Sequence, residues 1–145
     1  MENVVIRELQ TLEDILEAYP VMRELRTHLN EQSYLDLVKE AREEDSYKMV
    51  ALYDQDNIVA VVGFKPMITL YYGRFVWVCD LVTSQTMRSK GYGEKLLFYV
   101  HEWAKLNDYE CVALSSGLQR EGAHRFYESK MNYNKVSYVF KMDLE

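Results

Sequence analysis

The sequence has few of the residues that build disulfide frameworks, metal centres and disordered segments. Its 145 residues include 2 cysteines, 3 histidines, 2 prolines and 6 glycines. Both cysteines lie in apolar, strand-like runs, which is typical of reduced packing residues rather than of a disulfide. The histidines are scattered without paired spacing, so no metal site is predicted. With 48% hydrophobic residues, the chain is expected to form one compact domain over residues 1–145.

The sequence also lacks long apolar runs and an excess of positive charge. No apolar run approaches the length of a membrane span, and charged residues occur too early for a secretory signal, so a cytoplasmic protein without a membrane partner is expected. Lys and Arg number 17 against 23 Asp and Glu, a net charge of −6. Nucleic-acid binding needs clustered cations, so this composition argues against it and mildly favours a cationic partner. A modest negative charge also serves solubility alone.

Hydrophobic periodicity predicts strands alternating with helices. The first helix is expected to begin at a capping box of Thr11 and Asp14 and to kink or divide at Pro20, and the second to begin at Ser33. Strands are expected at 4–9, 47–53, 58–64, 74–83, 110–115 and 136–143, and further helices at 92–107 and 121–130. This order predicts a mixed α/β fold, with a helical crossover after a long central strand.

The loop between that central strand and the next helix combines two glycines with two cations. Residues 88–94 read Arg-Ser-Lys-Gly-Tyr-Gly-Glu. Gly91 and Gly93 let a ligand approach the backbone, and the amides and dipole at a helix N-terminus favour anions. Arg88 and Lys90 add positive charge for a phosphate. Two glycines at a helix start can also simply shape a turn, and neither common nucleotide-binding loop is completed here.

The pattern Arg-x-x-Gly-x-Gly after a long strand resembles the acetyl-CoA loop of the GNAT family of N-acetyltransferases. The resemblance covers nearly the whole chain and implies a GNAT-type mixed sheet of about six to seven strands flanked by about four helices. It implies acetyl-CoA as the cofactor, with the pantetheine arm along Leu81, Val82 and Thr83. It also implies that the CoA pyrophosphate lies on the loop formed by Arg88, Ser89, Lys90, Gly91, Tyr92, Gly93 and Glu94.

A second motif, at residues 121–128, resembles the Ala-x-x-Phe/Leu-Tyr helix of the same family. Tyr127 aligns with the tyrosine that protonates the departing thiolate, a role that suits a phenol held near sulfur. Taken alone, Phe126 and Tyr127 would more often be a core pair. Arg120 stands where many relatives carry an asparagine, and Asn132 extends the usual helix end by one residue.

The general base is left open by the sequence. Relatives that use a carboxylate often place it on the central strand, where this chain has Cys79 followed by Asp80. Asp80 is the candidate base, directly or through water, but it could equally bind the charge of the amine. His124 has a suitable pKa range and can as easily pack or cap a helix.

The function expected from these residues is transfer of the acetyl group of acetyl-CoA to a primary amine by direct attack in a ternary complex. The alternative is a non-catalytic acyl-CoA-binding regulatory module. The acceptor is expected to be a small-molecule or peptide amine, with a preference for a cationic one if the aromatic residues at 34, 71, 72, 77 and 92 line one pocket. Similar proteins often form homodimers, and either the last strand or the edge of the central strand could serve as the interface.

Overall fold

The computed structural model describes residues 4–144, which fall into two compact units. The first unit ends at Ala113 and the second begins at Leu114. Among the residues described, no helix has the length and apolar character needed to cross a bilayer.

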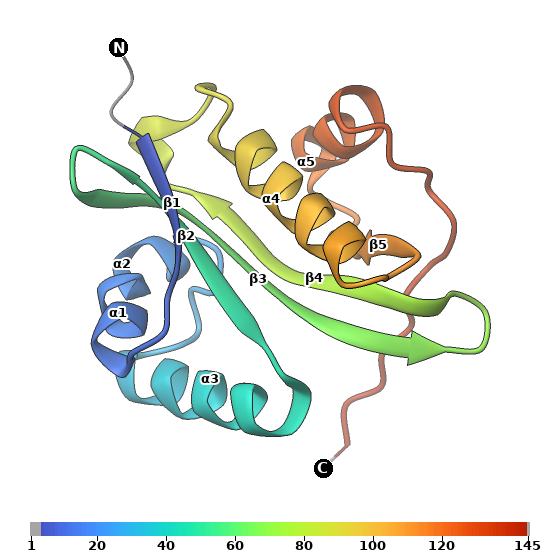
Figure 1. Cartoon of the computed structure of the whole chain (residues 1–145), viewed down its shortest axis with the longest axis horizontal. Helices are drawn as coiled ribbons and strands as arrows, with labels where there is room; N and C mark the ends of the chain where they lie inside the picture. Colours follow the sequence, from blue (N-terminus) through green and yellow to red (C-terminus); the bar gives the residue numbers. More distant parts are fainter. Residues whose placement is uncertain (1–3, 145) are drawn as a thin grey trace. The chain divides into compact units, whose positions relative to one another are not determined.

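One sheet organises the fold. Its five strands lie in the order β1-β2-β3-β4-β5, with bounds Val4–Glu8, Lys48–Asp54, Asn57–Thr69, Gly73–Thr83 and Cys111–Leu114. The first four are antiparallel neighbours. Helix α4 (Tyr92–Leu106) connects β4 to β5, as expected for the crossover after the central strand (Figure 1). The predicted mixed α/β class is therefore confirmed.

The first helices differ in detail from the prediction. The capping box of Thr11 and Asp14 is present at α1 (Leu12–Glu17), and Pro20 lies in the first turn of a separate helix, α2 (Tyr19–Met22), so it divides the segment. Helix α3 (Glu31–Asp45) begins three residues earlier than expected. The side chain of Asn30 accepts a hydrogen bond from the Ser33 amide, so Asn30 is the N-cap and Ser33 the third residue of a capping box.

The predicted last strand, residues 136–143, is wrong. In the structure, residues 131–144 contain no helix or strand, and the described sheet has five strands instead of about six to seven. The apolar side chains of Val136, Tyr138, Val139 and Phe140 are largely exposed. Their β-branched and aromatic composition favours a strand locally, but a strand also requires a neighbouring backbone as partner, which composition does not reveal.

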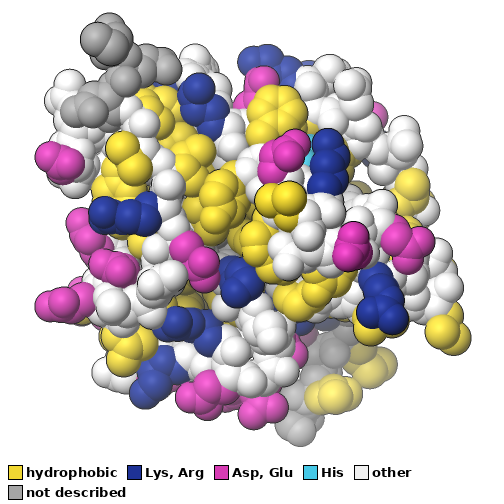
Figure 2. All heavy atoms as spheres, in the orientation of Figure 1, with side chains coloured by type: hydrophobic (Ala, Val, Ile, Leu, Met, Phe, Trp, Pro, Cys, Tyr) yellow, Lys and Arg dark blue, Asp and Glu magenta, His cyan; other side chains and the backbone are white. Residues whose placement is uncertain are grey.

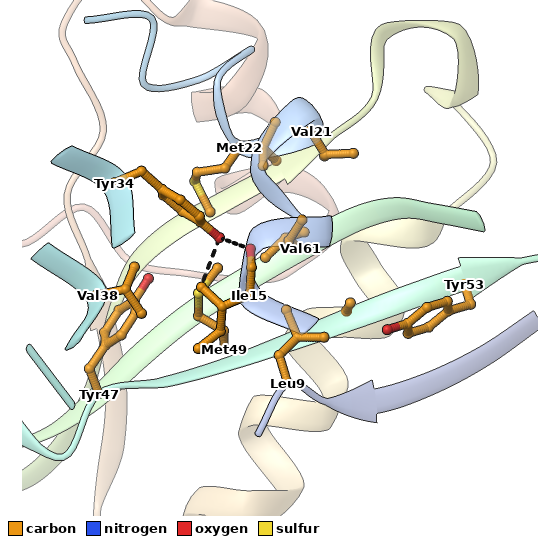
Figure 3. Close-up of a cluster of buried hydrophobic side chains, with 13 residues drawn as sticks. Leu9, Ile15, Val21, Met22, Tyr34, Val38, Tyr47, Met49, Tyr53 and Val61 are labelled. Atoms are coloured by element: carbon orange, nitrogen blue, oxygen red, sulfur yellow. Dashed lines mark hydrogen bonds between the residues drawn. The ribbon is translucent and has the colours of Figure 1, made fainter. Parts of the chain in front are cut away.

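The two faces of the sheet bury different helices. Helices α1, α2 and α3 cover one face, where Ile15, Met22, Tyr34 and Met49 meet in the core, and Tyr34 donates a 2.6 Å hydrogen bond to the Ile15 carbonyl (Figure 3). Helix α4 covers the opposite face with buried apolar residues such as Leu97. Strand β2 is buried along its whole centre because both faces are covered.

Candidate functional site

The glycine loop enters helix α4 through left-handed backbone conformations. Ser89 has φ of 69° and Gly91, the N-cap of α4, has φ of 80°. Left-handed residues set between right-handed or extended ones turn successive amides toward one side and form an anion-binding concavity. Glycine suits position 91, because a Cβ atom disfavours this left-handed conformation. The loop thus connects β4 to α4, with a glycine at the start of the helix.

Helix α4 begins without the side-chain cap that α1 and α3 possess. No side chain caps its N-terminus, and the first turn ends where the Lys95 amide donates to the Gly91 carbonyl at 3.1 Å. The amides of the first turn point out of a 15-residue helix, at the positive end of its dipole. Arg88 and Lys90 are exposed beside them. This arrangement suits a phosphate group.

Two side chains fix the loop to the sheet. The Tyr92 hydroxyl is buried and donates to Asp54 Oδ2 at 2.7 Å, which anchors the start of α4 to the end of β2. Arg88 Nε donates to the Thr83 carbonyl at 3.4 Å, at the end of β4. The side chain of Tyr92 is therefore structural, and only its backbone can belong to a phosphate cradle.

The end of β4 extends past its neighbour β5. The Glu110 amide donates to the Arg74 carbonyl at 2.8 Å near the start of β4, and β5 has 4 residues against 11 in β4. Because β5 starts beside the start of β4 and is much shorter, β5 ends before the level of Leu81. Leu81–Thr83 therefore lie beyond the end of β5. Their other edge pairs with β3 at Ala60–Val62. A strand edge of this kind offers backbone groups to an extended ligand.

Asp80 lies next to a β-bulge in β4, where side chains from other segments contact it. Gly63 pairs with Asp80 but Phe64 pairs with Val78, so Cys79 is an extra residue on β4. Arg26 Nε donates to Asp80 Oδ1 at 2.8 Å, and the Tyr47 hydroxyl donates to Oδ2 at 2.6 Å. Arg26 also donates through Nη2 to the Cys79 carbonyl at 2.8 Å. Both oxygens of Asp80 are thus held by strong, charge-assisted hydrogen bonds.

Glycine at position 63 is required by the Tyr47–Asp80 bond. A Cβ at this position would overlap the Tyr47 hydroxyl and ring. We expect Gly63→Ala to push the Tyr47 ring away from Asp80 and to destabilise the fold by about 1–3 kcal/mol, as overpacking does. Urea denaturation measures this loss. Gly122→Ala, where the nearest atom lies at an ordinary 3.8 Å, is the matched control and should not lower stability comparably.

Asp80 and its partners line a cavity of about 300 Å³ in the first unit. Its walls come from the end of α2 and the segment after it, from α3, from Tyr47 just before β2, and from strands β3 and β4. The lining residues are Met22, Arg26, His28, Leu29, Tyr34, Leu37, Val38, Ala41, Asp45, Tyr47, Lys65, Cys79 and Asp80. Lys65 and Asp45 form a second ion pair, with 3.3 Å between Nζ and Oδ2. Burial raises the pKa of the Tyr47 hydroxyl well above its usual value, and the charge of Asp80 adds to this effect.

Cys79 is a neutral thiol in this cavity. Burial, aided by the negative charge of Asp80, raises its pKa to about 12. Because the thiolate is the reactive form, we expect Cys79 in the folded protein to resist iodoacetamide at pH 8, while the exposed Cys111 is alkylated first. Peptide mass spectrometry measures both rates. The same shift predicts that the stabilising contribution of Cys79 is complete below its ordinary pKa and is lost as pH rises towards 12.

Tyr127 lies in the second unit, on a π-helical turn (Phe126–Lys130) that continues helix α5 (Glu121–Arg125). Its ring packs against Phe126 and Tyr133, with centroids 5.4 Å and 6.0 Å away. Burial raises the pKa of the Tyr127 hydroxyl, while the positive charge of Arg120 and its hydrogen bond to that hydroxyl partly offset the rise. The hydroxyl is therefore protonated at neutral pH and adjoins a cation.

His124 and the remaining aromatic residues make mostly local contacts. His124 Nε2 lies 2.8 Å from the Gly117 carbonyl, a local contact within the second unit. Tyr71 and Tyr72 pack against one another at the β3–β4 turn, with centroids 4.5 Å apart. Of the five aromatic residues considered for an acceptor pocket, Tyr34 alone lines the cavity. The described residues contain no group of three or more His, Cys, Asp or Glu side chains suited to a metal ion.

The sequence profile of the Acetyltransferase (GNAT) family matches residues 9–133. The chain belongs to this family. The match includes residues of both units. A relative from Bacillus subtilis (strain 168), described as the uncharacterized N-acetyltransferase YhdJ, is 42% identical over 136 residues, which are 94% of this chain and 96% of the relative.

Solved structures share the GNAT fold at low sequence identity. The aminoglycoside N-acetyltransferase AAC(6')-Iy, in complex with CoA, has a TM-score of 0.87 at 10% identity, covering 99% of this chain and 96% of that one. A protein from Bacillus halodurans C-125 described as a transcriptional regulator has a TM-score of 0.85 at 22% identity, covering 98% and 100%. Their different descriptions show that the fold by itself does not select one function.

Sequence reasoning missed Arg26 and Tyr47. They lie 54 and 33 residues before Asp80 and carry no local motif. The sequence signal for this cluster is weak. A glycine inside a strand can mark a bulge or a close approach, and Gly63 marks both.

Proposed function

We propose that this GNAT protein transfers the acetyl group of acetyl-CoA to a primary amine by direct attack in a ternary complex. The observation that carries the proposal is the entry into helix α4, where an uncapped N-terminus follows left-handed Ser89 and Gly91. This backbone suits the CoA pyrophosphate, with Arg88 and Lys90 as accessory cations. The complete cradle consists of Arg88, Ser89, Lys90, Gly91, Tyr92, Gly93 and Glu94, with Leu81, Val82 and Thr83 along the pantetheine arm.

The acceptor amine binds in the cavity at Asp80. An ammonium ion must lose a proton before its nitrogen can attack the thioester carbonyl. The carboxylate of Asp80 contacts Arg26 and Tyr47, and we assign it the binding of the amine and the acceptance of its proton, directly or through water. The attack forms the C–N bond and breaks the C–S bond, so CoA leaves as a thiolate.

Tyr127 supplies the proton to this thiolate. Its hydroxyl is protonated because burial raises its pKa, and the neighbouring charge of Arg120 favours donation as negative charge develops. In this proposal Arg120 acts on Tyr127, in place of the amide contact that the usual asparagine provides in relatives.

The test combines cofactor binding with turnover. We expect CoA and acetyl-CoA to raise the melting temperature of the protein, and steady CoA release, followed with a thiol reagent, when amines from a mixed panel are added. Stabilisation by CoA without release with any amine would support the non-catalytic binding module instead. If neither CoA nor acetyl-CoA stabilised the protein, both functions would be excluded.

A further inference from the structure

A preformed pair of opposite charges, Arg26 and Asp80, lines the cavity in the first unit. Arg26 Nε and Asp80 Oδ1 are 2.8 Å apart, and the Asp80 side chain is 16% exposed against 39% for Arg26. The pair is fixed from three directions: by Tyr47 on the carboxylate, by the Cys79 carbonyl on the guanidinium, and by the bulge opposite Gly63. A ligand that enters therefore meets a positive and a negative group held side by side.

Both members of the pair retain hydrogen-bonding capacity. Each carboxylate oxygen of Asp80 accepts one of the hydrogen bonds described above and has a further lone pair. Arg26 uses Nε and one Nη2 hydrogen, and a guanidinium has five donors in a planar fork that matches a carboxylate. The pair can thus accept from a cation and donate to an anion at the same time.

From this geometry we infer that the acceptor is a free α-amino acid with an apolar side chain. Its ammonium group binds Asp80, its carboxylate binds Arg26, and its side chain contacts the apolar wall. This inference rests on the acetyl transfer proposed above and names the substrate class of the same site. An α-amino acid carries its two charges on one carbon atom, so their spacing matches adjacent charges of the protein better than any simple amine does.

The rest of the cavity agrees in charge and polarity. Lys65 lies at the second ion pair with Asp45, so two carboxylates face two cations and no excess negative charge is present to attract a polycation. The remaining wall is mainly aliphatic and aromatic, contributed by Leu29, Tyr34, Leu37, Val38 and Ala41. On the face seen in Figure 2, acidic and basic side chains of the described residues are interspersed and neither sign gathers into a patch.

The size of the cavity points to a small acceptor. A volume of about 300 Å³ is at the lower end for small-molecule sites. It accommodates one amino acid, whereas an oligosaccharide or a peptide chain would have to extend well outside it.

The experiment compares L-leucine with L-leucinamide and spermidine as acceptors in the wild-type protein. Leucinamide lacks the carboxylate but has the less basic amine, so a preference for leucine cannot arise from a larger neutral fraction. We expect kcat/KM for leucine to exceed that for leucinamide by at least about tenfold, mostly through KM, with spermidine lower still.

Variants identify the residue responsible. Arg26→Gln should remove the preference for leucine over leucinamide, and Arg26→Lys, which keeps a charge beside Asp80 but loses the fork, should restore it only in part. Arg23→Gln, in the same segment after α2 but exposed and outside the cavity, should leave the preference unchanged. If both Arg26 variants unfold, the comparison of substrates in the wild-type protein still decides.

The outcomes separate this inference from the proposed function. Turnover of leucinamide or spermidine as efficient as that of leucine would overturn the inference while acetyl transfer stands. If no amine is acetylated, the proposed acetyl transfer is wrong. Melting temperatures then test whether the cavity binds an α-amino acid. Stabilisation of the CoA-loaded protein by leucine beyond that by leucinamide would then support it, and equal or no stabilisation would overturn it.

Discussion

Replacing Tyr127 by Phe is expected to lower the steady rate of CoA release about 100-fold, because a positioned general acid contributes on that order. The substitution removes the hydroxyl and keeps the ring that packs against Phe126 and Tyr133. Stabilisation by CoA should therefore persist. The measurement is the initial rate of thiol release with a saturating amine, together with the melting temperature with and without CoA.

The control for this variant is Tyr138→Phe, which removes a hydroxyl from an exposed tyrosine in the same unit. It should release CoA at the wild-type rate. The direction of the Tyr127 pKa gives a second check. Because burial raises it, the acid stays protonated through the pH at which an ordinary tyrosine ionises, so activity should not fall on the basic side before that point. Equal rates for wild type and Tyr127→Phe would exclude Tyr127 as the acid.

Replacing Gly91 by Ala is expected to abolish the rise in melting temperature that CoA produces and to raise the KM for acetyl-CoA at least about tenfold. Gly91 has φ of 80°, and a left-handed conformation costs a residue with a Cβ roughly 1–2 kcal/mol. A Cβ at this position meets no protein atom within 4 Å, so in the folded protein it would project into open space next to the proposed cradle. The loss therefore comes from the altered backbone and from obstruction of the phosphate.

Gly73→Ala is the matched control, since Gly73 has φ of 75° but lies at the β3–β4 turn. Its Cβ would overlap the flexible end of the Glu110 side chain, which can move aside. Without ligand, the melting temperature of this variant should fall to a similar degree as that of Gly91→Ala. CoA should still raise its melting temperature as much as it raises that of the wild-type protein. A Gly91→Ala protein that still responds to CoA like wild type would mean that the loop is only a turn.

The loop and the helices around it were predictable because their signals are local. The capping box at Thr11 and the glycines at the start of α4 depend on residues within a few positions of each other. Asn30 was missed as the N-cap because it and Ser33 both have capping side chains, and the choice between them depends on where the chain leaves α2. The last strand failed for a related reason: a strand depends on a partner as well as on its own residues.

The sequence by itself determined the family, the alternation of strands and helices, and the loop that we propose as the CoA site, because short-range spacing and periodicity specify these features. The tertiary structure alone decided which groups surround Asp80. The β4 bulge, Gly63, Tyr47 and Arg26 come from distant parts of the chain and meet only when the sheet and the segment after α2 pack together. Side-chain packing cannot be read from a local sequence pattern. It makes Asp80, an acidic residue on a strand, one member of a fixed pair of opposite charges.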